Sequence, residues 1–299
     1  MVLAYKAFRF AMNAEISNFV QTACIWEACA RKVGNVHRIR DFASTSLTDF
    51  LLSSSAIGPS FSVSQSLGKT VLQAINATNT MVGQNTNLGI ILAIAPLALC
   101  RSDRPIREEI TRVLSELTVE DTRDVYRAIR IASPSGLGKV DNQDVSYEPT
   151  ATLLESMKLA ADRDQIARLY ATEYRDLFDF GLPVFANSFR SSGRIEPAII
   201  DLQFQWLARD PDSLIVRKND LMVAEEVRQH SANALALGGI RTIEGRRAGR
   251  ILDAFLRSNG NRLNPGTTAD LIVAVLFVAL RERIVTPRGP FPWQVEDWL

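Results

Sequence analysis

The sequence predicts an all-α fold: a single multi-helix globular domain over residues 1–299 with two apolar central helices. Apolar residues recur at spacings of three, four and seven along nearly the whole chain, which is the period of an amphipathic helix. The chain has no alternation typical of strands, no hairpin signature and no internal repeat. Two runs, 88–100 and 269–280, are strongly apolar but shorter than the ~20 residues of a membrane span, so we expect both to be core helices.

The first half of the chain carries recognisable helix starts and stops. Ser46 with Asp49, and Thr118 with Asp121, have the spacing of a capping box, in which the two residues bind each other's backbone N–H groups. A Gly-Pro pair at 58–59 is expected to end the helix that Ser46 begins, because proline disrupts a helix interior. We therefore expect helices at 17–32, 46–56, 66–82, 88–100, 106–117 and 118–132.

The second half continues the helical pattern after one clear loop. Residues 133–147 contain Pro134, Gly136 and Gly138, which favour turns. The tail at 286–299 has three prolines and two tryptophans, and its aromatic residues (Phe291, Trp293 and Trp298) are able to cover either the core or a neighbouring subunit, which leaves a homodimer open. We expect helices at 149–161, 164–180, 183–191, 196–208 and 212–237 and, after a Gly-Gly break at 238–239, at 242–257 and 269–280.

Composition excludes several classes of partner. The chain has 34 Lys plus Arg against 33 Asp plus Glu, and a net charge of +1 gives no electrostatic reason to expect nucleic acid or a membrane surface as a partner. Its three cysteines include no CxxC pair, so we expect buried free thiols and a cytoplasmic location. The N-terminal segment lacks the long uncharged core of a signal peptide.

The most informative motif is Asn-Pro-Gly-Thr-Thr-Ala-Asp at 264–270, directly before the second apolar run. The start of a helix is a natural binding place for an anion or a metal-bound phosphate, because its backbone N–H groups are free. Here the first turn adds two hydroxyls and a carboxylate. A similar polar turn at 85–89 precedes the first apolar run. Two polar turns joined to two buried helices predict one shared pocket, although an ordinary helix cap would also explain the turn at 85–87.

Two further polar clusters flank helices, at 27–41 and 209–218. In the first, four residues lie beyond the reach of a helix dipole: Asn35, His37, Arg38 and Asp41. Lys and Arg at a helix end are nevertheless common because of the dipole alone. A single histidine in a basic loop is more often a hydrogen-bonding residue than a catalyst, so we expect His37 to form hydrogen bonds. In the second, Arg217 and Lys218 are expected inside the long helix 212–237, where positive charge gains nothing from the dipole. Carboxylates, cations and amides together suit a polyphosphate held with Mg²⁺, which usually takes one or two carboxylates plus phosphate oxygens.

These motifs, in this order, resemble those of the triphosphoribosyl-dephospho-CoA synthases, the enzymes that make the prosthetic-group precursor of citrate lyase and malonate decarboxylase. The chain has Lys-Val-Gly-Asn-Val at 32–36 where the family has Lys-Pro-Gly-(Leu or Asn)-Val. It has Gly-Gln-Asn-Thr-Asn-Leu-Gly at 83–89 where the family has Gly-Val-Asn-Thr-His-Lys-Gly. The motif at 264–271 is the most specific match. The departures at Val33, His37, Asn87 and Leu88 indicate a divergent branch, similar to members from archaea and from bacteria that use methanopterin-type cofactors.

The resemblance implies a pentosyltransferase that moves the triphosphoribosyl group of ATP to dephospho-CoA or a related acceptor and releases adenine. Because such a transfer passes through an oxocarbenium-like state, negative charge is needed near the ribose and a carboxylate must accept the hydroxyl proton. The resemblance implies Glu27 as the base, Asp41 and Asp270 as metal or ribose carboxylates, and Asp212 as a further metal ligand. The nucleotide- and phosphate-binding residues would be Lys32, Asn35, Arg38, Asn85, Thr86, Asn87, Arg217, Lys218, Asn264, Gly266, Thr267 and Thr268, with Mg²⁺ as cofactor.

Two other functions are compatible with the residues. One is ribose-phosphate transfer to a pterin or aromatic acceptor in one-carbon cofactor biosynthesis. The other is a non-catalytic helical nucleotide-binding protein, which is favoured by the loss of the family's lysine at Leu88 and disfavoured by the intact motif at 264–270.

Overall fold

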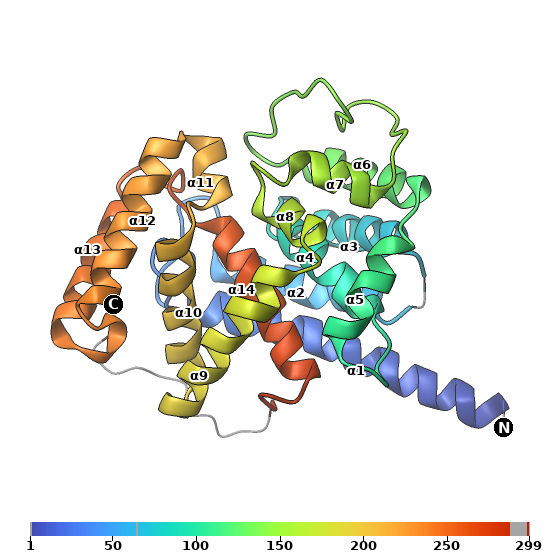
Figure 1. The fold of residues 1–299 in the computed structure, drawn as a ribbon, viewed down its shortest axis with the longest axis horizontal. Coiled ribbons are helices and arrows are strands. Elements are labelled where there is room, and N and C mark those ends of the chain that lie inside the picture. The colour runs from blue at the N-terminus through green and yellow to red at the C-terminus, as the bar shows by residue number, and fades with distance from the viewer. Residues whose placement is uncertain (1, 64, 288–297, 299) are drawn as a thin grey trace.

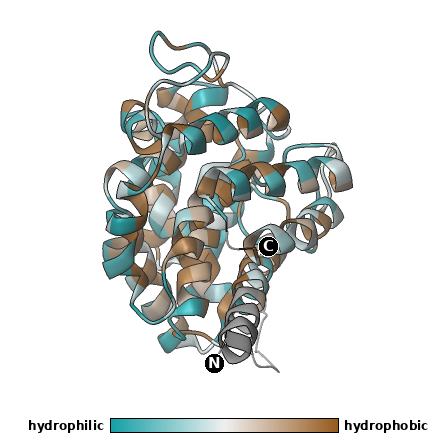
Figure 2. Cartoon of the chain, turned by 90° about the vertical axis from the view of Figure 1, so that its right-hand side faces the viewer, coloured by the Kyte–Doolittle hydropathy of each residue, from teal (hydrophilic) through white to brown (hydrophobic). Residues whose placement is uncertain are grey.

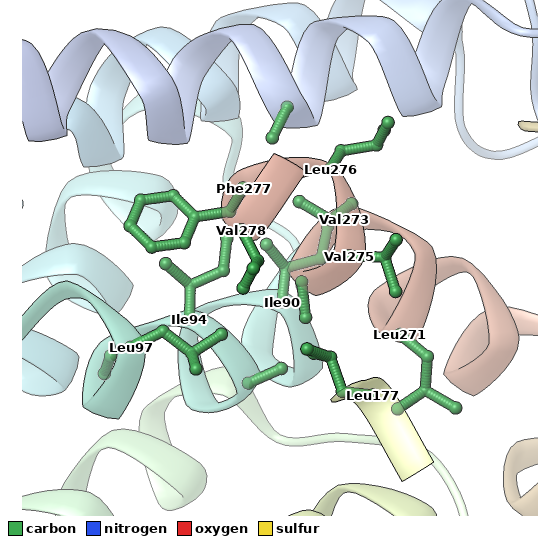
Figure 3. Close-up of a cluster of buried hydrophobic side chains, with 14 of the residues drawn as sticks. Ile90, Ile94, Leu97, Leu177, Leu271, Val273, Val275, Leu276, Phe277 and Val278 are labelled. Carbon is green, nitrogen blue, oxygen red and sulfur yellow. The ribbon is translucent and has the colours of Figure 1, made fainter. Parts of the chain in front are cut away.

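The apolar helix α14 (Gly266–Arg281) passes through the middle of the molecule, with other helices around it (Figure 1). The computed structural model describes residues 2–63, 65–287 and 298, with side chains from Ala14 onward. Every residue from Leu271 to Leu280 is buried, and helix α4 (Leu88–Leu99), which is buried along most of its length, packs against α14. Side chains of both helices form one cluster in Figure 3. The prediction of two apolar central helices is confirmed.

The remaining helices lie on two sides of α14 (Figure 1). Within the described residues there is no strand, only an isolated bridge between His37 and Arg40, so the predicted all-α class is confirmed. One side holds α1 (Val2–Cys29), α2 (Leu47–Phe61), α3 (Leu67–Val82), α5 (Ile106–Ser115), α6 (Val119–Ala132), α7 (Leu153–Ala160) and α8 (Gln165–Ala171). The other side holds α10 (Ile195–Arg209), α11 (Ser213–Lys218), α12 (Leu221–Ala236) and α13 (Ile243–Arg257), with α9 (Leu182–Ser192) below α14.

A second, smaller hydrophobic cluster lies among α10, α12 and α13. Trp298 belongs to it: its ring packs edge-on against Phe204 with the centroids 5.8 Å apart, and its Nε1 donates to the carbonyl of Arg31 at 2.7 Å. This tryptophan therefore covers the core of its own chain, which is one of the two options open from the sequence. The other two aromatic residues of the tail, Phe291 and Trp293, lie outside the described residues.

Two prolines lie inside helices, because a side chain from another helix replaces the hydrogen bond that each proline removes. Pro59 leaves the carbonyl of Ser55 without its helical donor, and Gln21 Nε2 donates to that carbonyl at 3.1 Å. Pro96 does the same to Leu92, whose carbonyl accepts from the Tyr170 hydroxyl at 2.7 Å. The prediction that the Gly-Pro pair ends the second helix is therefore wrong, since α2 continues to Phe61.

Two predicted helices are each broken once. The helix expected at 164–180 ends as α8 at Ala171, the backbone turns through Glu173 and Tyr174 at φ +53° and +60°, and a π-helical turn (Leu177–Gly181) leads into α9. The turn is held by the buried Tyr174 hydroxyl, which donates to the carbonyl of Ala93 at 2.9 Å. The helix expected at 212–237 is interrupted after Lys218, and Asp220 caps α12 by accepting from the Val223 N–H at 2.9 Å.

Both predicted capping boxes are present, at the start of α2 with Ser46 and Asp49 and at the start of α6 with Thr118 and Asp121. A third, with Thr152 and Glu155, starts α7. The predicted loop after α6 extends to Thr152, and it rises above the helices as a mostly hydrophilic segment (Figure 2). This loop and the first turns of α4 and α14 position the site.

Candidate functional site

A cavity of about 920 Å³ lies where the first turns of α4 and α14 meet the end of α1, α8 and α11, and the loop after α6 borders it. One residue from each of the four predicted polar clusters lines it: Asn35, Asn85, Lys218 and Asp270. The predicted shared pocket therefore exists. The other predicted site residues in its wall are Glu27, Thr86, Asn87, Arg217, Asn264, Gly266 and Thr267.

The first turn of α14 is capped by a residue of another helix. Pro265 precedes α14 and provides no side-chain cap. Asp212 Oδ2 instead accepts from the backbone N–H and the hydroxyl of Thr268, both at 2.7 Å, while its Oδ1 accepts from the N–H groups of Leu214 and Ile215 at 2.9 and 3.1 Å. One carboxylate thus caps the first turns of both α11 and α14. Asp212 and Thr268, predicted as metal and phosphate ligands, bind each other and are absent from the cavity lining.

The turn after α1 is joined to the turn before α14. Asn35 Nδ2 donates to Asn264 Oδ1 at 2.6 Å. Gln203 of α10, which is fully buried, holds Asn35 in place: its Nε2 donates to Asn35 Oδ1 at 2.9 Å and to the Val33 carbonyl at 2.8 Å, while its Oε1 accepts from the Val33 N–H at 2.9 Å. Gly34 between them has φ +68°, which favours glycine. The two amides are therefore held in fixed positions at the cavity.

Glu27 brings a carboxylate to the cavity and is accompanied by a buried cation. Lys32 Nζ lies 3.0 Å from Glu27 Oε1, and it also donates to the Ala30 carbonyl at 3.2 Å. Burial raises the pKa of Glu27, and the charge of Lys32 opposes that rise. Lys32 does not line the cavity, so it contributes to the site through Glu27.

Asp270 lies against the first turn of α4. A Cβ atom built on Gly89 would come within 1.9 Å of Asp270 Oδ2, so only glycine fits beside this carboxylate. Burial raises the pKa of Asp270 well above its usual value, and the negative charges of Glu27 and Asp212 raise it further, while Arg217 opposes them. The cavity lining therefore contains several carboxyl groups, and the charges of Glu27 and Asp164 disfavour the ionisation of Asp270.

The turn before α4 presents polar atoms that have no protein partner. Asn85 Oδ1 caps α4 by accepting from the Leu88 N–H at 3.1 Å. Asn87 Oδ1 accepts from the Thr78 hydroxyl at 3.1 Å, but Asn87 Nδ2 and the Thr86 hydroxyl are buried without a hydrogen bond. A buried polar atom without a partner costs about 1–3 kcal/mol, so these two atoms are candidates for ligand contacts.

Cations gather at α8 and α11. Arg217 Nη1 lies 3.1 Å from Asp164 Oδ2, and Lys218 Nζ donates to the Asn261 carbonyl at 3.3 Å. Burial lowers the pKa of Lys218, and the charge of Arg217 lowers it further. Because α11 ends at Lys218, both cations lie in its last turn, where the helix dipole favours them; the expectation that they lie inside a long helix is wrong. Two more cations that line the cavity are Arg163 and Lys139.

Besides Asp212, Thr268 and Lys32, two predicted site residues, Arg38 and Asp41, lie outside the cavity lining. Arg38 Nη2 bonds to Glu196 Oε2 at 3.0 Å, and Arg31 binds the same carboxylate through Nε and Nη2, each at 3.1 Å. Asp41 is exposed and its Oδ1 accepts from the Leu47 N–H at 2.7 Å, at the start of α2. Both side chains have structural partners, and their predicted roles in binding and catalysis stay predictions.

His37 is buried and does not line the cavity. Burial lowers the pKa of His37 to about 3, and the surrounding positive charges of Lys32, Arg257 and Arg38 lower it further. The imidazole is therefore neutral. Neither of its ring nitrogens has a hydrogen-bond partner, so the expectation of a hydrogen-bonding histidine is wrong.

The sequence did not single out three residues that organise the site: Gln203, Glu196 and Asp164. Each belongs to a predicted helix or its start, where a polar residue is unremarkable. Their partners lie 170, 165 and 53 positions away in the chain, so no local pattern indicates the contact.

Among the described residues, no three His, Cys, Asp or Glu side chains form a group that could hold a metal ion. Of the three predicted metal ligands, only Asp270 faces the cavity. A cation here would therefore need oxygens from a substrate. None of the described helices is both long and apolar enough to cross a membrane.

Comparisons with known proteins identify a family and a similar fold. A family model described as ATP:dephospho-CoA triphosphoribosyl transferase matches residues 13–288. A crystal structure of a proposed triphosphoribosyl-dephospho-CoA synthase from Archaeoglobus fulgidus is similar to this fold, with a TM-score of 0.60 and 25% sequence identity over 78% of this chain and 98% of that one. A search of curated proteins found no match.

Proposed function

The chain belongs to the ATP:dephospho-CoA triphosphoribosyl transferase family, and on that premise we propose that the cavity between α4, α14 and α11 is the active site of this transfer. The activity moves the triphosphoribosyl group of ATP to dephospho-CoA and releases adenine. The observation that carries the proposal is the meeting of two carboxyl groups, Glu27 and Asp270, with the cations Arg217 and Lys218 in one cavity.

The two kinds of charge suit the two ends of the transferred group. Arg217, Lys218 and Arg163 would bind the triphosphate, because cations form strong, charge-assisted hydrogen bonds with phosphate oxygens. The carboxyl groups of Glu27 and Asp270 would lie near the ribose, where positive charge develops as the bond between C1′ and the adenine nitrogen breaks. ATP would therefore lie with its phosphates toward α8 and α11 and its ribose toward α4.

In this transfer, the bonds formed and the bonds broken balance without a third reactant. The acceptor hydroxyl forms a bond to C1′, and its proton passes to a carboxylate, for which Glu27 with its partner Lys32 is our candidate. The electron pair of the broken bond leaves with adenine, which takes up a proton. Lys32 limits the rise of the Glu27 pKa that burial causes, which favours the ionised form that a base requires.

The binding of Mg²⁺ is a further part of the proposal. The described residues contain no preformed metal-binding group, so the ion would enter with ATP, held mainly by phosphate oxygens and water, as is usual for Mg²⁺ in nucleotide sites. No step above depends on a protein-bound metal.

The test of the function is to incubate the purified protein with ATP, Mg²⁺ and dephospho-CoA and to measure free adenine. Adenine release that depends on dephospho-CoA supports the proposal. Release that instead requires a pterin or aromatic acceptor would assign the protein to the alternative ribose-phosphate transfer. ATP binding without adenine release from any of these mixtures would identify a nucleotide-binding protein.

Removing the divalent cation should stop the reaction without destabilising the free protein. EDTA in excess is expected to abolish adenine release, while the melting temperature of the ligand-free protein stays unchanged, because the carboxylates in the described part of the chain form no metal-binding group. Thermal unfolding with and without EDTA checks this. A fall in melting temperature would reveal a resident structural metal and contradict our account.

Substituting Arg217 should weaken ATP binding more than it slows the chemical step. Arg217→Met removes a charge-assisted contact worth about 1.5–3 kcal/mol, so the KM for ATP is expected to rise by roughly 10- to 100-fold with a smaller change in kcat. The matched control is Arg123→Met, which removes an exposed arginine whose Nε lies 3.0 Å from Glu148 on the outer side of α6. An unchanged KM in Arg217→Met would place the triphosphate elsewhere.

Location and assembly complete the proposal. A cytoplasmic location is supported by three free cysteines and by the use of ATP. A homodimer stays a prediction, since the described part of the tail, Trp298, packs on its own chain.

A further inference from the structure

The turn before α4 contains a buried side-chain amide whose oxygen is hydrogen-bonded and whose nitrogen is not. Asn87 is 4% exposed, and its Oδ1 is held by the Thr78 hydroxyl of α3 at 3.1 Å. Its Nδ2 has no hydrogen-bond partner and the residue lines the cavity. The Thr86 hydroxyl beside it is also buried without a partner. Because Thr78 occupies the amide oxygen, the group available to a ligand is the N–H₂ donor.

The charges around Asn87 restrict what that donor binds. The Asp270 carboxyl lies against Gly89, two residues further along the same turn, and Glu27 lines the same cavity. A phosphate only accepts hydrogen bonds and carries negative charge, so Asp270 and Glu27 disfavour it beside Asn87. Arg163, Arg217 and Lys218 favour it near α8 and α11, even though Arg217 is paired there with Asp164. A hydroxyl group suits this end of the cavity, because its oxygen accepts from the amide while its proton is donated to a carboxylate.

We propose that Asn87 and Asp270 bind the ribose hydroxyls of ATP, with Asn87 Nδ2 donating a hydrogen bond to one hydroxyl oxygen and the Asp270 carboxyl group hydrogen-bonded to a ribose hydroxyl. This inference rests on the proposed function and assigns the sugar contacts within it. It makes Asn87 a specificity-determining residue that distinguishes ribonucleotides from deoxyribonucleotides. It also gives a chemical reason for an uncharged side chain at this position: the residue binds the sugar, and phosphate binding is left to Arg217 and Lys218.

The test compares binding of ATP, 2′-deoxy-ATP, 3′-deoxy-ATP and inosine triphosphate, each with Mg²⁺, by calorimetry. The wild-type protein is expected to bind ATP about tenfold more tightly than at least one of the deoxy analogues, because that analogue leaves the buried amide unpaired. Asn87→Ala should lose this discrimination and bind ATP as weakly as the wild type binds that analogue. Asn187→Ala, an exposed asparagine of α9, is the control and should discriminate as the wild type does.

The possible failures are distinguishable. Failure of the wild-type protein to bind ATP at all would contradict the proposed function. ATP binding without discrimination against either deoxy analogue, measured on the wild type alone and so independent of whether the variant folds, would overturn the sugar assignment only. If Asn87→Ala loses discrimination between ATP and inosine triphosphate but keeps it for the deoxy analogues, the amide contacts the base and the sugar assignment is wrong.

Discussion

Asp270→Asn is expected to lower the rate of adenine release by at least roughly 10²–10³-fold and, at neutral pH, to raise the melting temperature of the protein. The loss of rate follows if Asp270 ionises in the complex with ATP, where the positive charge that develops on the ribose favours its carboxylate form, since removing one such electrostatic contact typically costs that much. The gain in stability follows from its surroundings: burial and the charge of Glu27 make ionised Asp270 costly in the folded state. The side chains have the same size, so asparagine fits beside Gly89.

The stability difference should depend on pH in a defined direction. The pKa of Asp270 is higher in the folded than in the unfolded protein, so its protonated form is favoured by folding. At pH values below the pKa of about 3.9 that aspartate has in the unfolded protein, Asp270 is protonated in both the folded and the unfolded state. The substitution then adds no stability. As the pH rises above this value, the wild type loses stability until the pH passes the pKa that Asp270 has in the folded protein. Over the same range, the stability of Asp270→Asn relative to the wild type increases.

Thermal unfolding of both proteins between pH 4 and pH 8 checks this, together with adenine release at neutral pH. The matched control is Asp162→Asn, which neutralises an exposed carboxylate near α8 that does not line the cavity. Gly89→Ala provides an independent test, because its Cβ would displace the Asp270 carboxyl and should also lower the rate. Full activity in Asp270→Asn would remove Asp270 from the mechanism; lower stability at neutral pH would contradict our account of its burial.

Asp212→Ala is expected to have the largest effect on stability, lowering the free energy of unfolding by about 3–5 kcal/mol. The carboxylate accepts four hydrogen bonds and begins both α11 and α14, and it is 1% exposed. Loss of a helix cap typically costs about 1 kcal/mol and reaches about 2, and each buried N–H left unpaired adds a cost of its own. Because α11 carries Arg217 and α14 carries Asp270, binding of ATP should weaken as well.

Urea unfolding followed by circular dichroism measures this change. Asp220→Ala is the control, since this aspartate also caps a helix but accepts only one backbone hydrogen bond, from Val223, at an exposed position. Its loss should cost only about 1 kcal/mol. Equal losses for the two variants would show that Asp212 acts as an ordinary cap and does not join α11 to α14.

The fold class, the starts of several helices and the four polar clusters were predictable from the residues alone. Helical periodicity and capping boxes depend on residues within about four positions of one another, so Ser46 with Asp49 and Thr118 with Asp121 were predictable. The two apolar runs had to be buried, which brought the polar turns before them close together. That is why residues as distant in the chain as Asn85 and Asp270 were correctly expected in one pocket.

The packing of the helices sets which polar side chains face the cavity and which ones join the helices around it. Asp212 and Asp270 both belong to polar turns at helix starts, yet one joins two helices and the other lines the site. Their different environments come from residues far along the chain: Thr268 for Asp212, and Gly89 and Glu27 for Asp270. The same holds for the break at Tyr174, which its hydrogen bond to α4 stabilises. Local sequence fixes where a helix begins, but the partner of a buried polar group depends on which helices pack against it, and that is set by the whole fold.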